Sequence, residues 1–182
     1  MNKEVFDAEI RDLVARRDIY SALCRYMRGQ DRLMPDLQPS AFHDDAYVDS
    51  GLFRGDAAGF VAFAQDALRN MISTHHQMGQ TDIRVEGEAA YGEVYFVAQH
   101  RIAEGHGMID LFIAGRYVDE YRRRDSSWRI FKRRLVIDWV RSGPASDDFI
   151  SKNRPLNIGK RGLEDFSLTR QWPIENHAPT PD

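Results

Sequence analysis

The sequence predicts an α+β fold, with helices first and a strongly bent antiparallel sheet of long strands after them. Apolar residues recur at helical spacing in the first 71 residues, interrupted by one short extended segment. From residue 81 to residue 139 the pattern changes to long alternating segments separated by short polar turns. The regular pattern stops after Ser142, which predicts that the fold ends there.

The N-terminal region predicts three helices. The first runs from Glu4 to about Arg28, the second is short and begins near Pro35, and the third opens at Asp56 and reaches about residue 71. On the first helix, residues at i, i+3, i+4 and i+7 predict a stripe that faces the core. The members of this stripe are Ile10, Leu13, Val14, Arg17, Tyr20, Cys24, Met27 and, unexpectedly, Asp31.

Five strands are expected, at residues 46–50, 81–86, 90–102, 108–124 and 128–139. Turns are predicted at 86–88, 104–107 and 125–127, where glycine, serine and charged residues gather. We therefore expect one domain over residues 1–142. Residues 143–182 form an irregular extension, in which scattered apolar side chains favour packing over the domain or a neighbouring subunit rather than a disordered tail. These side chains are Phe149, Ile150, Phe166 and Trp172.

Composition excludes several classes of protein. A net charge of −3 argues against nucleic acid as a partner, and the single cysteine, Cys24, excludes a disulfide framework and a multi-thiolate metal site. A basic run at residues 122–134 straddles a predicted turn, which favours solvated strand ends. No apolar signal region or membrane-spanning stretch is visible, so we expect no membrane partner and a cytoplasmic location.

Asp31 and two histidines carry the chemical prediction. A carboxylate on a core-facing stripe is costly to bury unless donors or a cation meet it. His100 faces the apolar side of strand 90–102, and of the neighbours His75 and His76 only one can enter the same interior. The alternatives are a solvated helix terminus for Asp31 and a structural core role for His100.

Together these residues predict a general base. An aspartate that accepts from one imidazole nitrogen fixes the tautomer and raises the basicity of the other nitrogen. Such a base can take a proton from a carbon beside a carbonyl or from a phenol. Two histidines and one carboxylate are also the ligand set of non-haem iron sites, but no metal-binding histidine spacing is present, and we expect no metal.

Further residues are candidates for the walls of a pocket. Phe96 and Phe112 are expected as apolar walls, and Tyr47 and Tyr117 as hydroxyl-bearing side chains at the edge or inside. Arg133 shares the strand parity of three apolar residues and is expected to face inward with them. The three are Phe131, Leu135 and Ile137.

Residues 8–142 resemble the SnoaL-like group of the nuclear transport factor 2-like superfamily, and in particular its scytalone dehydratase branch. The motifs, taken in order, are Gly29-Gln30-Asp31, residues 74–79 (THHQMG), residues 98–101 (AQHR) and residues 128–133 (WRIFKR). The last motif also resembles hexachlorocyclohexane dehydrochlorinase. The resemblance implies a cone-shaped barrel of curved antiparallel sheet closed by the N-terminal helices, with a pocket inside.

The resemblance also implies roles for single residues. Asp31 matches the catalytic aspartate, His76 its partner base, and His100 the second histidine of the dehydratase branch. Arg133 matches the arginine near the dyad in the dehydrochlorinase. Gln30 and Ser50 stand where the dehydratase has two water-orienting tyrosines, and Tyr117 lies near its site asparagine, so scytalone itself is not the expected substrate.

The expected function is a dehydratase-type lyase that acts on a hydroxylated aromatic or polycyclic small molecule without a metal or organic cofactor. A retro-aldol carbon–carbon lyase and a dehydrohalogenase would use the same dyad. A non-catalytic small-molecule-binding module of this fold is the alternative outside enzymes. A homo-oligomer is expected from the mixed outer sheet face around residues 91–97, and a trimer more than a dimer by the resemblance.

Overall fold

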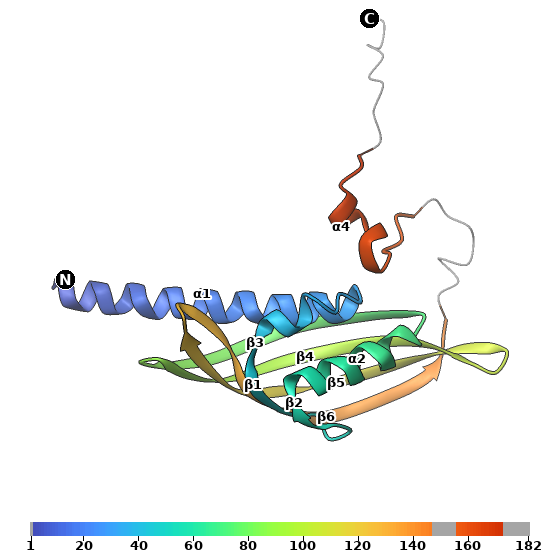
Figure 1. The fold of residues 1–182 in the computed structure, drawn as a ribbon. Helices are drawn as coiled ribbons and strands as arrows, with labels where there is room; N and C mark the ends of the chain where they lie inside the picture. The colour runs from blue at the N-terminus through green and yellow to red at the C-terminus, as the bar shows by residue number, and fades with distance from the viewer. Residues whose placement is uncertain (1, 147–155, 173–182) are drawn as a thin grey trace, which may run out of the picture.

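The computed structural model describes residues 2–146 and 156–172 (Figure 1). The long helix α1 (Lys3–Asp31) lies on one side of a curled sheet, and the shorter helix α2 (Ala57–Arg69) lies farther along it. The remaining elements are the 3-10 helix η1 (Gln38–Ala41), strands β1 (Phe42–Asp49), β2 (Arg54–Asp56), β3 (Ser73–Glu86), β4 (Ala89–Glu104), β5 (Gly107–Arg124) and β6 (Ser127–Pro144), the 3-10 helix η2 (Gly162–Glu164), and the single-turn helix α4 (Phe166–Thr169). The predicted α+β class is confirmed.

The sheet has six strands in the order β2-β1-β6-β5-β4-β3. Strands β3 to β6 form an antiparallel meander joined by tight turns, as expected. Strand β1, however, pairs parallel to β6, so the sheet is mixed rather than wholly antiparallel. The reason is topological: β6 leaves its outer edge free at the end of the meander, and the earlier strand β1 fills that edge in the same direction.

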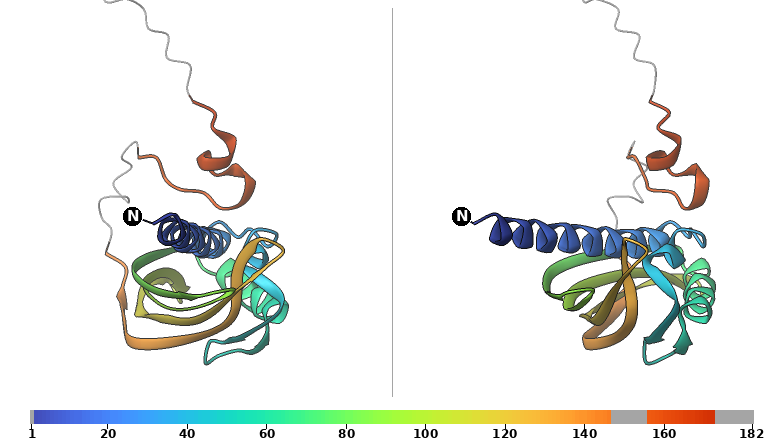
Figure 2. Two further views of the ribbon diagram at one scale, coloured as in Figure 1. Left: turned by 90° about the vertical axis from the view of Figure 1, so that its left-hand side faces the viewer. Right: turned by 60° about the vertical axis from the view of Figure 1, so that its left-hand side comes forward.

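The sheet curls around the helices to form an open cone (Figure 2). Its end strands, β2 and β3, do not pair with each other, so the cone is not a closed barrel. Irregularities between Ala114 and Gly115 and between Glu120 and Tyr121 bend the long β5–β6 pair. A Cβ atom at Gly115 would come within 2.3 Å of the carbonyl oxygen of Val136, so the bend needs glycine there.

Helix α1 buries a different face from the one predicted. The core side is formed by Ala15, Ile19, Ala22, Leu23 and Tyr26. Most of the predicted stripe lies opposite, with Leu13 61% and Tyr20 53% exposed. Only in the last turns of α1 is the predicted stripe buried as well. Met27 and Asp31 are buried there because β3 and η1 also surround the helix.

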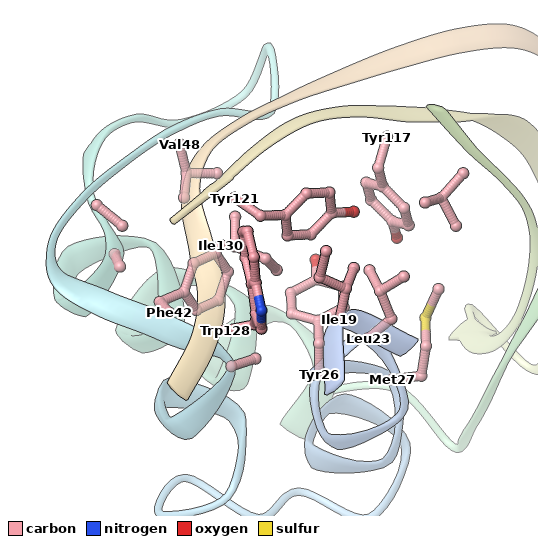
Figure 3. Packing of buried hydrophobic residues seen from close by; sticks show 14 of the residues in the cluster. Ile19, Leu23, Tyr26, Met27, Phe42, Val48, Tyr117, Tyr121, Trp128 and Ile130 are labelled. Carbon is pink, nitrogen blue, oxygen red and sulfur yellow. The ribbon is translucent and has the colours of Figure 1, made fainter. Parts of the chain in front are cut away.

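The core lies between α1 and the sheet and combines aliphatic residues such as Ile19, Leu23 and Ile130 with a group of aromatic side chains (Figure 3). Tyr26 contacts Phe42 and Tyr117 edge to face, with ring centroids 5.7 and 5.6 Å apart. Such pairs add to the apolar burial energy and orient the rings. Trp128 and Tyr121 are buried alongside them.

Several element boundaries differ from the prediction. The helix expected near Pro35 is a series of turns ending in η1, and Phe42 begins β1 instead of belonging to a helix. Strand β3 starts at Ser73, well before residue 81, because a register shift between Met78 and Thr81 interrupts its alternation. The two adjacent histidines therefore lie in a strand rather than in a loop.

The described part of the C-terminal extension, residues 156–172, contacts the domain beside the ends of α1 and α2. The backbone N–H of Gly162 donates to the Arg32 carbonyl at 2.7 Å, and Arg28 donates to the Ser167 hydroxyl at 3.1 Å. Phe149 and Ile150 lie outside the described residues. No helix in the described part of the chain has the length and hydropathy to cross a bilayer.

Candidate active site

A cavity of about 250 Å³ lies between α1, α2 and the concave face of the sheet. Its walls are mainly apolar, and the polar groups are few and come from separate elements, as is typical of a small-molecule site. The polar or aromatic lining residues are Tyr26, Gln30, Ser50, Phe60, Phe63, His76, Phe96, His100, Tyr117 and Arg133.

Asp31 and His76 are in direct contact at this cavity. Asp31 is the last residue of α1, and its Oδ1 lies 2.7 Å from Nδ1 of His76. Its Oδ2 accepts the backbone N–H of the same histidine at 2.9 Å. Because a carboxylate can only accept, the Nδ1 proton sits between the two side chains and Nε2 is left as the basic nitrogen. The expected contact is present, and the catalytic role of the pair stays a prediction.

His100 lies across the strand pair from Thr74, on the same face of the sheet as His76. Its ring is nearly perpendicular to the His76 ring, with centroids 5.1 Å apart. Burial, together with the neighbouring His76, lowers the pKa of His100 to about 4. At neutral pH His100 is therefore an uncharged imidazole that can donate or accept a hydrogen bond but does not carry an extra proton.

Arg133 is buried beside the cavity and is held on two sides. Asp119 accepts from its Nε at 2.8 Å and from its Nη2 at 2.6 Å, and the Tyr121 hydroxyl donates to the same carboxylate. The guanidinium carbon lies 4.3 Å from the ring centroid of Tyr26 and 4.0 Å from that of Tyr117. Burial opposes the charge, but Asp119 outweighs it and raises the Arg133 pKa.

Four of the other predicted wall residues line the cavity: Gln30, Ser50, Phe96 and Tyr117. Burial raises the pKa of Tyr117 well above its usual value, so it stays a neutral hydroxyl.

Two predicted wall residues lie elsewhere. Tyr47 is 45% exposed and does not line the cavity, because it alternates with the buried Ala46 and Val48 on β1. Phe112 is on the outer face of β5, where it packs against Trp139 with ring centroids 4.9 Å apart. It alternates with Leu111 and Ile113, which line the cavity.

Strand alternation could have revealed the error at Phe112 and also the residue that the prediction missed. Tyr117, Asp119 and Tyr121 share one face of β5, and Phe112 is on the other. An acid between two aromatic residues on an inward face needs a buried donor, by the same reasoning that singled out Asp31. Asp119 and Arg133 are cross-strand partners in the β5–β6 register.

Arg161 of the C-terminal extension also lies near the site. No pattern in the sequence indicated this position. Its Nη1 donates to the carbonyl oxygens of Leu68 and Met71 at 2.8 and 2.9 Å, at the end of α2. Both of those residues line the cavity. Burial lowers the Arg161 pKa and the charge of Asp31 opposes that shift.

Among the described residues, no cluster of possible metal ligands supports the alternative of an iron site. In residues 2–146 and 156–172, no three histidine, cysteine, aspartate or glutamate side chains come together in an arrangement that could hold a metal ion. Asp31 directs both of its oxygens to His76 instead.

The fold and the site define an open-cone α+β protein with an acid–histidine pair at an apolar internal cavity. The family model of the SnoaL-like domain matches residues 11–134, and the chain belongs to that family. This match spans the sheet up to the middle of β6 and includes Asp31, His76, His100 and Arg133, whereas Arg161 lies outside it. No curated protein sequence matches the chain.

Solved structures with low sequence identity share the fold. A protein from Novosphingobium aromaticivorans provisionally named a scytalone dehydratase superposes with a TM-score of 0.64 at 20% identity, over 71% of this chain and 88% of the other. A hexachlorocyclohexane dehydrochlorinase, LinA type 2, gives 0.62 at 22% identity, over 76% and 92%. A nuclear transport factor 2-like protein with a cystatin-like fold, also from N. aromaticivorans, gives 0.61 at 18%, over 84% and 97%.

Proposed function

We propose that the protein is a cofactor-independent lyase in which His76, held by Asp31, is the general base. The observation that supports this most is the double contact of one carboxylate with both the ring and the backbone N–H of His76. That contact fixes the ring, its tautomer and the direction of Nε2. A histidine with only a structural role in the core needs one hydrogen-bond acceptor for its ring N–H, and a backbone carbonyl would be enough.

The proposed step is an elimination. Nε2 of His76 takes a proton from a carbon of the substrate, and the electron pair of that C–H bond forms a new C=C bond. A neighbouring hydroxyl leaves with the C–O bonding pair and takes up the proton from Nε2, so it departs as water and the base is restored. Asp31 stabilises the imidazolium that forms in between. Neutral His100 donates a hydrogen bond to the oxygen on which negative charge develops. Arg133 also lines the cavity, with its charge compensated by Asp119.

The cavity indicates the class of substrate. Its apolar lining favours a ring compound with a few oxygen atoms, because a sugar or a phosphate would leave many polar groups without partners. Its volume of about 250 Å³ is below the roughly 300–1,000 Å³ typical of drug-sized ligands. We therefore propose a hydroxylated compound of one or two rings rather than a larger polycyclic one.

Water loss is the favoured elimination, and two others remain alternatives. Loss of halide or of a small aldehyde by retro-aldol cleavage begins with the same base. The fold neighbours named as a dehydratase and a dehydrochlorinase support the lyase class. A binding module without catalysis is the competing proposal, since the same fold hosts different functions.

The test begins with a ligand and ends with variants. Mass spectrometry of small molecules released from the purified protein identifies candidate substrates, and related hydroxylated ring compounds form the assay panel. His76→Ala and Asp31→Asn should each lower turnover by about 10²–10⁴-fold, and together by little more, because the two residues act as one unit.

The matched control is His75→Ala. His75 is the neighbouring histidine on the exposed face of β3, so its loss should leave turnover unchanged. Wild-type turnover by both dyad variants, with ligand still bound, would favour the binding module.

A further inference from the structure

Helix α1 carries a second apolar face that the domain does not cover. Phe6, Ile10, Leu13 and Tyr20 are between 42% and 61% exposed. They lie on the side of the helix opposite the buried residues Ala15, Ile19 and Ala22. A surface helix normally has one apolar face, so the exposed one needs a separate explanation.

The exposed face has the spacing of a helix–helix interface. Phe6, Ile10, Leu13, Arg17 and Tyr20 follow one another at alternating steps of four and three residues, which is the a/d pattern of a coiled coil. The N-terminal part of α1 also extends beyond the edge of the sheet (Figures 1 and 2). The described C-terminal segment meets α1 near its other end, at Arg28.

Charge along the helix sets the direction in which a partner helix would lie. On or beside this face, Asp7 and Glu9 come first and Arg16 and Arg17 follow them. Residues 3–12 as a whole carry four acidic and two basic side chains. A parallel copy in register would place like charges side by side, and an antiparallel copy would place acidic residues opposite basic ones.

We propose that two copies of this chain pair through these exposed faces of α1, antiparallel and about a two-fold axis. Ile10 then packs against the partner's Leu13, and Leu13 against the partner's Ile10. Phe6 lies against the Arg17 guanidinium of the other copy, a cation–π contact. Glu9 and Arg16 lie on the same side of this apolar seam. Arg16 already donates from Nε to Asp12 and from Nη1 to the Ile83 carbonyl, and its Nη2 would then meet Glu9 of the partner subunit.

The C-terminal part of the seam is already fixed, because the domain buries α1 from Ala15 onward. The first turns of α1 extend past the sheet, and the pairing would cover them with the partner helix. The seam spans residues 3–20, a length of about 27 Å at 1.5 Å per residue. A two-fold contact of this kind is closed, so it doubles the assembly and does not extend into a fibre.

The first experiment compares masses by sedimentation at increasing concentration. Leu13→Glu should halve the mass that the wild-type protein reaches, whatever assembly its other faces make. The control is Val5→Glu, because Val5 is as exposed as Phe6 (49% each) but lies on the core-facing side of the helix, past the sheet. Val5→Glu should keep the wild-type mass.

The second experiment tests the direction by disulfide capture in a Cys24→Ser background. A mixture of Ile10→Cys and Leu13→Cys proteins should form the mixed disulfide far faster than either protein alone forms its own. Faster self-capture of Leu13→Cys would overturn the antiparallel arrangement. Equal masses for wild type and Leu13→Glu would overturn the pairing itself, and binding of the wild type to anionic lipid vesicles would then assign this face to a membrane surface.

Discussion

The buried pair of Asp119 and Arg133 allows a test of the cavity that needs no substrate. Their side chains are 0% and 1% exposed, and two hydrogen bonds join them. We expect Asp119→Asn to keep the shape of the side chain and to remove its charge. The amide oxygen can still accept from the Tyr121 hydroxyl and from Arg133 Nη2, whereas the amide NH2 faces the Nε donor of Arg133. The change therefore removes the counter-charge together with one hydrogen bond.

The expected cost follows from the environment of Arg133. Removing one partner of a buried ion pair leaves an unpaired charge in a low dielectric, which costs about 3–5 kcal/mol. The stacked rings of Tyr26 and Tyr117 offset part of this loss by about 0.5–2 kcal/mol. We therefore expect the free energy of unfolding to fall by about 2–4 kcal/mol.

Urea unfolding monitored by tryptophan fluorescence and circular dichroism measures this change. Asp45→Asn is the matched control, because it breaks an exposed pair with Arg124 and should leave the free energy of unfolding nearly unchanged. The double variant Asp119→Asn/Arg133→Met should recover much of the lost stability, since it removes the stranded charge. A loss below about 1 kcal/mol in Asp119→Asn would refute the view that Asp119 compensates the Arg133 charge.

Two further predictions concern pH and assembly. The low pKa of His100, about 4 against 6.5 unfolded, means that the unfolded chain takes up a proton between these values and the native protein resists it. Stability should therefore fall by about 2 kcal/mol from pH 7 to pH 5 through this residue. The pH dependence of urea unfolding in His100→Gln should lack that component, and an unchanged dependence would contradict the assignment. The outer sheet face, where Tyr95 is 42% and Trp139 52% exposed, is expected to join copies into a trimer. Light scattering should show a smaller assembly for Trp139→Glu, and equal masses would exclude that face.

The sequence predicted the fold well where one face of an element is buried. Strand β4 alternates without interruption from Val94 to His100, and its inward histidine was placed correctly. Helix α1 misled the prediction because both of its long faces carry apolar residues, and periodicity alone does not say which face meets the sheet. The prediction that Asp31 is buried was nevertheless correct, because both sides of α1 are buried in its last turns.

The direction in which a site residue faces could be predicted where its strand alternates regularly. Near a β-bulge this prediction was less accurate. The irregularity opposite Glu120 and Tyr121 inserts Phe131 as an extra residue in β6. Phe131 consequently lies among the outer cations Arg122 and Arg124, although it shares sequence parity with the inward Arg133. A one-residue insertion of this kind reverses the faces of a strand and leaves little trace in composition.

The contact of Arg161 with α2 ties the cavity wall to a segment outside the matched family region. Just past the end of α2, the Leu68 carbonyl already accepts the backbone N–H of Met71, and Arg161, some ninety positions later in the chain, adds a side-chain donor to the Leu68 and Met71 carbonyls. A truncated protein that ends with β6 would keep every residue of the proposed dyad and still lose this donor. Shortened forms made for expression or crystallography would then show weakened ligand binding, which would be mistaken for a defect in the chemistry of His76.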